Sequence, residues 1–307
     1  MRLLDAHCSA KSAIVAATVV ACLVTTAGQL TAAPRPSGTV PQGMSGPTRI
    51  ETALDGEATA SVVALANRTR DALGFPAGVR QVATHVSDGF EGIEYNEVAE
   101  TDASGAIISL AQFDMTGNVL TAARLDRPPS VGGDVGASVA VATAQQTVLR
   151  VGFDLGAPSS TVRDDATSGW TLHWARREAG VPVRGDETRL QLFRDGTVQS
   201  MARIRHQLAP APDQRMDAAA AVQVATDSVG RWSADSATGY ALQATSLQWV
   251  EPNGAFDPAQ ISTTPVPYRL AWVTDVQPQG AAADYVWLIQ LFVDAGDGTV
   301  IGGDFVE

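Results

Sequence analysis

Lysine, cysteine and histidine are scarce in this 307-residue chain, and each scarcity excludes a class of protein. Lys11 is the only lysine, and the net charge is −12. Because affinity for a phosphate backbone comes from basic side chains, we expect no nucleic-acid partner. Both cysteines, Cys8 and Cys22, lie close to the N-terminus. The rest of the chain therefore has no disulfide, no thiolate nucleophile and no cysteine metal site.

The sequence also lacks the motifs that mark a catalytic or cofactor centre. It contains no His-Glu-x-x-His, no P-loop and no Gly-x-Gly-x-x-Gly. Its four histidines, His7, His85, His173 and His206, do not have the spacing of metal ligands. We therefore predict no catalytic residue, no metal site, no cofactor and no enzymatic activity.

Residues 1–33 have the pattern of a secretory signal. Arg2 and Lys11 form the basic region, an apolar run follows, and small residues at 31–33 favour cleavage. Two alternatives stay open. Cys22 follows Val-Val-Ala, which resembles a relaxed lipidation motif, and residues 12–33 are long enough to act as an uncleaved anchor. We expect an extracytoplasmic protein, secreted or associated with the cell envelope, that meets a membrane only through this segment if it is retained or lipidated.

Residues 34–50 are rich in Pro, Gly and Ser and predict a flexible linker. In the remainder, one phrase occurs three times, at 113–125, 193–204 and 292–306. Each copy has an aromatic residue, an Asp, a Gly and then a Val, flanked by alternating residues, which is typical of a tight β-hairpin. The clearest turns are predicted at Asp195 and Gly196, and at Asp294 and Gly298.

A helical pattern precedes each hairpin. Val62, Ala66 and Leu73 share one helical face in the first, Ser138 is a possible N-cap in the second, and Asp217 is a plausible N-cap in the third. Further strands lie between helix and hairpin. The sequence thus predicts an α+β fold of repeated units, each with one helix packed on a small antiparallel sheet. We expect an N-terminal unit at 51–130 and two clearer units at 137–209 and 213–307.

Residues 170–204 resemble the propeptide motif of fungalysin and thermolysin-type metallopeptidases. The motif has a strand, a Gly180-Val181-Pro182-Val183 turn followed by Gly185, and a strand that ends at Asp195-Gly196. The resemblance implies that Arg184-Gly185-Asp186 leads from a turn into a strand and is no cell-adhesion signal.

The third unit resembles the PepSY domain that follows in such propeptides. Its tryptophan strand at 268–276 and its hairpin at 292–303 carry the likeness, although the turn after Asp294-Ala295 is one residue longer than the usual one. Together the two resemblances cover roughly residues 140–307 in the family's order.

These resemblances imply a propeptide-like protein without the peptidase domain. We interpret the chain as a non-catalytic exported protein that binds a secreted zinc metallopeptidase and inhibits it or assists its folding. Phe305, Val306 and Glu307 are candidate contacts with the partner. The alternative is a cell-envelope scaffold or ligand-binding protein that uses the same fold.

Overall fold

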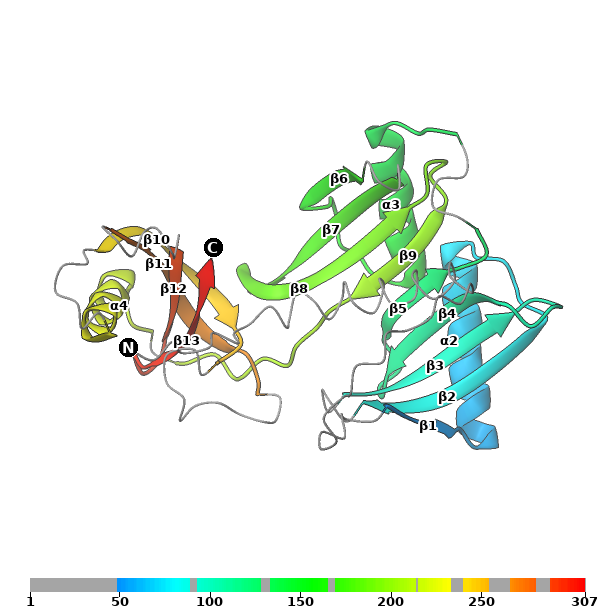
Figure 1. The fold of residues 1–307 in the computed structure, drawn as a ribbon, viewed down its shortest axis with the longest axis horizontal. Helices are drawn as coiled ribbons and strands as arrows, with labels where there is room; N and C mark the ends of the chain where they lie inside the picture. The colour runs from blue at the N-terminus through cyan, green and yellow to red at the C-terminus, as the bar shows by residue number, and fades with distance from the viewer. Residues whose placement is uncertain are drawn as a thin grey trace, which may run out of the picture. The chain divides into compact units, whose positions relative to one another are not determined.

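A computed structural model describes residues 49–88, 93–127, 133–164, 169–213, 215–232, 240–253, 266–279 and 288–306 (Figure 1). The described helices are α2 (Gly56–Leu73), α3 (Ala137–Val151) and α4 (Ala218–Trp232). The strands are β1 (Arg49–Ala53), β2 (Arg80–Asp88), β3 (Ile93–Thr101), β4 (Ile107–Asp114), β5 (Val119–Arg124), β6 (Ser160–Asp164), β7 (Gly169–Glu178), β8 (Val181–Leu192), β9 (Val198–Arg203), β10 (Tyr240–Val250), β11 (Arg269–Pro278), β12 (Leu288–Asp294) and β13 (Val300–Val306). The expected leader and almost all of the expected linker lie outside the described residues.

The predicted α+β arrangement of separate helix-on-sheet units is wrong. The thirteen strands belong to one mixed sheet, in the order β1-β2-β3-β4-β5-β9-β8-β10-β11-β12-β13, with β7 paired to β8 and β6 to β7. Antiparallel pairing of β5 with β9 and parallel pairing of β8 with β10 join strands that were expected in different sheets. The physical reason is that a small sheet leaves edge N–H and C=O groups unpaired, and here these groups bond to another strand.

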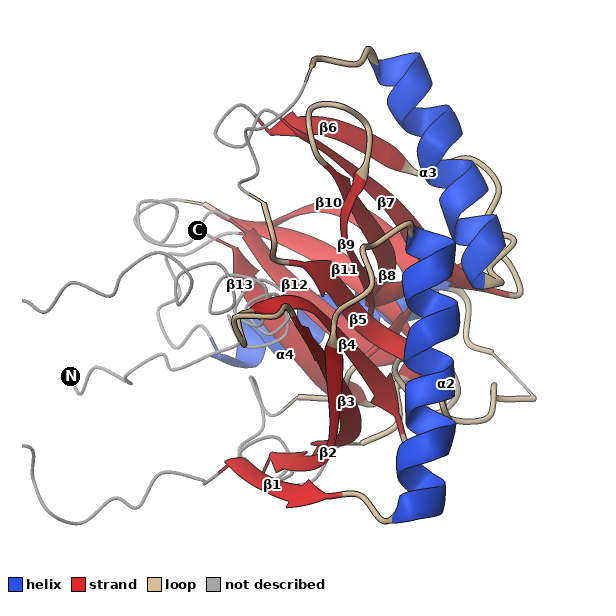
Figure 2. Cartoon of the chain, turned by 90° about the vertical axis from the view of Figure 1, so that its right-hand side faces the viewer, coloured by secondary structure: helices blue, strands red, loops and turns tan. Residues whose placement is uncertain are grey.

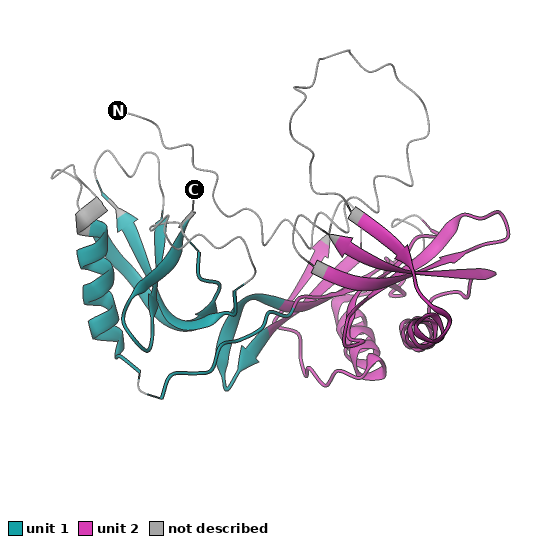
Figure 3. Ribbon diagram, turned by 90° about the horizontal axis from the view of Figure 1, so that it is seen from below, with its two compact units in different colours: residues 1–14, 176–186, 205–307 teal, residues 15–175, 187–204 magenta. Residues whose placement is uncertain are grey.

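The chain divides into two compact units (Figure 3). Among the described residues, those within 176–186 and 205–306 belong to unit 1, and those within 49–175 and 187–204 belong to unit 2. Strand β8 contributes to both, because the division falls between Asp186 and Glu187.

In unit 2, α2 and α3 lie side by side on the same side of the sheet (Figure 2). Asp55 caps α2, and its side chain accepts a hydrogen bond from the Ala58 N–H. The predicted apolar face of α2 is confirmed, since Val62, Ala66 and Leu73 are buried. Val62 and Ala66 pack against strand residues of β3 to β5, chiefly Val98, Phe113 and Val119.

Helix α3 packs on strand β7. Ala140, Ala144 and Val148 share one core cluster with Leu172 and Trp174. The predicted cap at Ser138 is wrong, because α3 begins one residue earlier and its N-cap is a glycine without a side-chain hydrogen bond.

In unit 1, α4 covers one face of the sheet formed by β10 to β13. Ala221, Ala225 and Val229 pack in one cluster with strand residues that include Leu291. The predicted cap is confirmed, since the Ala220 N–H donates to Asp217 Oδ1 at 2.7 Å. A second apolar cluster contains Val250, Ala271, Val273, Phe292 and Ile301. None of the helices in the described part of the chain is long and apolar enough to cross a membrane.

Candidate functional site

The tripeptide Arg184-Gly185-Asp186 is built into unit 1. The Asp186 side chain is 0% exposed. It accepts hydrogen bonds from Arg176 at 2.9 Å and from the His206 ring at 2.5 Å. Arg184 pairs with Asp304 at 2.6 Å. A carboxylate that is buried and paired inside its own fold cannot reach a cell-surface receptor, which supports the structural interpretation of these residues.

Asp186 joins the β7–β8 hairpin to the segment that contains His206, twenty residues further along the chain. Burial alone would raise the pKa of its carboxyl, but hydrogen bonds from the His206 ring, the His206 N–H and Arg176 outweigh burial and hold the pKa below its usual range. The His206 ring stacks on Tyr268 with centroids 4.4 Å apart. Burial raises the pKa of the Tyr268 hydroxyl, so this ring stays neutral. The cluster ties β7, β8 and the chain before α4 to the start of β11.

The other described histidines also have partners. His173 Nδ1 lies 2.8 Å from Glu187 Oε2, and His85 Nδ1 lies 3.3 Å from Asn96 Oδ1. The hydrogen bond from His173 is the main reason why the pKa of Glu187 is lowered. Within the described residues, no three His, Cys, Asp or Glu side chains come close enough to hold a metal ion.

The motif residues of the expected propeptide-like segment lie on the β7–β8 hairpin and the β8–β9 turn. Gly180, with φ +81°, forms the hairpin tip together with Ala179, whose φ is +47°. Pro182 and Gly185 were expected in the turn, but they lie within β8, which begins at Val181. Gly185 has φ +77°.

The β8–β9 turn has the geometry that its sequence predicts. Asp195 Oδ1 accepts hydrogen bonds from the Thr197 N–H at 3.0 Å and from its hydroxyl at 2.6 Å. Gly196 has φ +79°. The aspartate therefore satisfies the turn backbone, and glycine supplies the left-handed residue.

The longer turn between β12 and β13 contains two such aspartate turns in succession. Asp294 Oδ1 accepts from the N–H groups of Gly296 and Asp297, and Asp297 Oδ1 accepts from the Thr299 N–H. Gly298 has φ +74°. Arg269 bridges the two carboxylates at 2.9 and 3.1 Å. The additional residue thus fits a hairpin turn whose two carboxylates share one arginine partner.

The candidate partner contacts lie at the end of the chain. Phe305 and Val306 belong to β13, where they pair with Ile289 and Leu288 of β12. Glu307 and the possible lipidation site Cys22 lie outside the described residues. The chain therefore continues in a paired strand as far as Val306.

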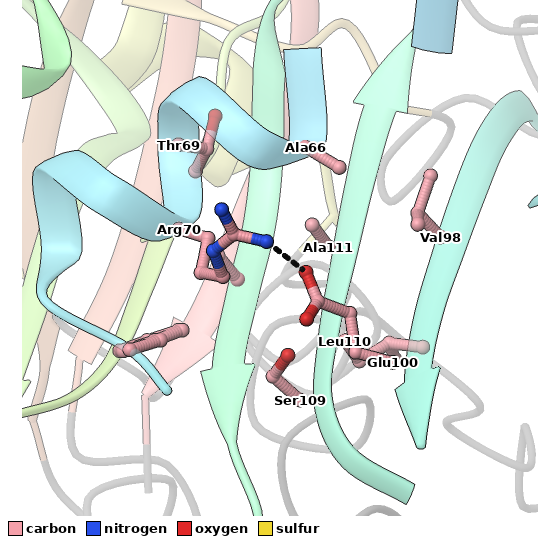
Figure 4. A pocket seen from close by; sticks show the side chains of 10 residues that line it. Ala66, Thr69, Arg70, Val98, Glu100, Ser109, Leu110 and Ala111 are labelled. Carbon is pink, nitrogen blue, oxygen red and sulfur yellow. Dashed lines mark hydrogen bonds and ion pairs between the residues drawn. The ribbon is translucent and has the colours of Figure 1, made fainter. Parts of the chain in front are cut away.

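A buried carboxylate under α2 was not identified from the sequence (Figure 4). Glu100 is 3% exposed. Its oxygens accept hydrogen bonds from the Gly78 N–H at 2.6 Å, Gln81 Nε2 at 3.0 Å and Arg70 at 3.3 Å. Glu100 lies two positions after Val98, and side chains two apart in a strand point to the same face of the sheet. Because Val98 is buried, this spacing indicates that Glu100 is buried too.

Beside this carboxylate is a small cavity with room for about one water molecule. Its lining, part of which is labelled in Figure 4, is Ala66, Thr69, Arg70, Phe75, Val98, Glu100, Ser109, Leu110, Ala111 and Ala122. A space of this size holds no substrate. The ion pair between Arg70 and Glu100 instead connects α2 to β3.

Comparison with known proteins identifies no family. No protein-family model matches the chain, and no curated protein matches it. Among solved structures, it is similar to the Bacillus megaterium YpeB C-terminal domain, with a TM-score of 0.42 and 12% sequence identity over 83% of this chain and 99% of that chain. Similarity at this level does not establish a shared family or activity.

Proposed function

We propose that this chain is a non-catalytic exported protein that binds a secreted zinc metallopeptidase and inhibits it or assists its folding. The observation that carries the proposal is the succession of propeptide-like motifs at residues 170–204 and 268–303. Both end in aspartate-glycine hairpins whose glycines, Gly196 and Gly298, have the positive φ that the motif requires.

The clusters in the described residues join elements of the fold, and the proposal gives them a structural role beneath a binding surface. The buried ion pairs of Asp186 with Arg176 and of Glu100 with Arg70 connect secondary-structure elements to one another. Such pairs fix the positions of strands and helices, and a fixed surface is what recognition by shape needs.

The proposal is tested by titrating the purified chain, residues 34–307, against thermolysin-like peptidases from the same genome. One assay measures the rate of peptide hydrolysis, and the other measures the yield of active peptidase on refolding from denaturant. We expect at least one peptidase to be inhibited at stoichiometric concentration or to refold in higher yield.

A chain carrying Asp213→Asn, a substitution at an exposed position, serves as a matched control and should behave like the wild type. Failure of the wild-type chain in both assays with every peptidase would contradict the proposal. That result would favour the alternative, a cell-envelope scaffold or ligand-binding protein.

A further inference from the structure

The C-terminal strand β13 is an edge strand whose sequence favours strand formation only weakly. It pairs with β12 and stands at the end of the sheet order. Gly302 and Gly303 contribute no side chain to the sheet, and glycine weakens a strand. Ile301 nevertheless anchors the start of β13, because its side chain is buried in the apolar cluster with Val273 and Phe292. Opening of this strand therefore concerns the residues that follow Ile301.

Asn253 holds the middle of β13. Its backbone N–H donates to Ile301 O at 3.0 Å, its side-chain Nδ2 donates to Gly303 O at 3.1 Å, and its Oδ1 accepts from the Gly303 N–H at 3.0 Å. A Cβ on Gly302 would lie 2.6 Å from Asn253 Oδ1. Asn253 thus makes the hydrogen bonds that a further strand would make, and Gly302 is the residue that allows its approach.

Arg184, from β8, holds the strand beyond this point. Its Nη2 lies 2.6 Å from Asp304 Oδ2 and 2.6 Å from Gln290 Oε1. Its guanidinium also lies over the Phe292 ring, 5.2 Å from the centroid. Gln290 and Asp304 are cross-strand partners on β12 and β13. Both charged side chains are partly buried, with exposures of 33% for Arg184 and 19% for Asp304. Water therefore screens the attraction between the two charges only in part.

We propose that Arg184 is a clasp that controls the release of β13, and that release presents Phe305 and Val306 to the partner. The clasp is the ion pair with Asp304, supported by Gln290. The role of the released strand rests on the function proposed above. The role of Arg184 as a clasp does not, because it is a property of unit 1 alone.

Hydrogen exchange of the wild-type chain and two conservative variants, Arg184→Gln and Asp304→Asn, tests the clasp. We expect the amides of residues 302–306 to exchange at least ~10-fold faster in both variants, since each removes a charge-assisted hydrogen bond. The amides of β11 should keep their wild-type rates. The double variant should exchange no faster than the single variants, because all three lack the same contact.

Arg177→Gln is the matched control. It makes the same change in the same hairpin, where Arg177 donates to Gly180 O at 2.7 Å, and it should leave residues 302–306 unaffected. Wild-type exchange rates in Arg184→Gln would overturn the clasp. Equal acceleration in β11 and β13 would also overturn it, because that pattern reports a loss of overall stability.

An inhibition assay separately tests whether release of β13 promotes binding to the partner. Against a peptidase that the wild-type chain inhibits, Arg184→Gln should inhibit at a lower concentration, by a factor comparable to the rise in exchange rate. Faster local exchange with unchanged inhibition would overturn the partner role and leave the clasp. If the wild-type chain neither inhibits nor binds any peptidase, the proposed function and the role of β13 in partner binding both fail. The hydrogen-exchange rates alone then show whether Arg184 controls the release of β13.

Discussion

At the residue scale, the backbone of the β8–β9 turn depends on a single glycine. Gly196 has φ +79°, and a Cβ there would lie 3.4 Å from Val135, an ordinary contact distance. The demand on this position is therefore conformational rather than steric. An L-residue with a side chain is disfavoured in the left-handed region.

We predict that Gly196→Ala lowers the free energy of unfolding by about 1 kcal/mol, measured by urea denaturation followed by tryptophan fluorescence. Gly56→Ala is the matched control. Gly56 begins α2 with a negative φ and has open space around it, so its variant should be as stable as the wild type or slightly more stable. Equal effects of the two substitutions would show that the turn does not need a left-handed residue.

Asp186 makes the stability of unit 1 depend on pH. Its pKa is lowered in the folded state. The contribution is therefore fully present above the unfolded-state pKa of about 4 and is lost as the pH falls through the lower, folded-state value. Glu187, whose pKa is also lowered, adds to the same acid-side loss in unit 2.

We predict that Asp186→Asn is less stable than the wild type by about 2 kcal/mol at pH 7, and that the difference shrinks as the pH falls below the unfolded-state pKa of about 4. Urea denaturation at a series of pH values measures it. The exposed control Asp213→Asn should match the wild type throughout. A difference between Asp186→Asn and the wild type that stays constant with pH would mean that the charge on Asp186 contributes nothing to folding.

At the element scale, two N-caps predicted with the same reasoning had opposite outcomes. The Asp217 carboxylate accepts from the Ala220 N–H in α4. Ser138 lies inside α3, where Gly136 is the N-cap. Sequence shows which residue types can cap, but the first residue of a helix also depends on where the preceding chain is held.

We predict that Asp217→Ala destabilises the fold by about 1 kcal/mol through loss of this cap. Ser138→Ala should change stability by less than about 0.5 kcal/mol, because the serine is not a cap and alanine favours helix. Thermal unfolding followed by circular dichroism at 222 nm compares the two variants. A larger loss for Ser138→Ala than for Asp217→Ala would contradict this assignment of the caps.

Local features of the fold could be predicted from sequence, and non-local pairing could not. Helical periodicity placed Val62, Ala66 and Leu73 on the buried face of α2. Aspartate and glycine marked the hairpin turns, because both act on the backbone within a few residues. Alternation of apolar residues identified strands but not their neighbours. Nothing local in residues 121–123 shows that they pair with residues 200–202 of β9, and this is why the sheet was divided wrongly.

The buried clusters were missed for a related reason. His206 and Asp186 are twenty positions apart, and Arg70 and Glu100 are thirty apart. Their contacts exist only once the strands are assembled. The two-residue spacing between Val98 and Glu100 could have indicated that Glu100 is buried, but it could not have identified Arg70 as the partner of Glu100.

At the scale of the whole molecule, each unit combines an apolar core with buried ion pairs. In unit 1 the core lies on both faces of β10 to β13, and in unit 2 it lies mainly between the sheet and the helices α2 and α3. A surface displayed on such a framework can recognise a partner by complementarity. We propose a secreted zinc metallopeptidase as this partner, on the basis of the propeptide-like motifs at 170–204 and 268–303.

Direct binding to a catalytically inactive thermolysin-like peptidase, measured by titration calorimetry, tests this claim most directly. An inactive peptidase cannot cleave the chain, so the heat reports association alone. We predict saturable 1:1 binding with a Kd on the order of 1 μM or tighter. Absence of saturable binding to every such peptidase encoded in the same genome would contradict it.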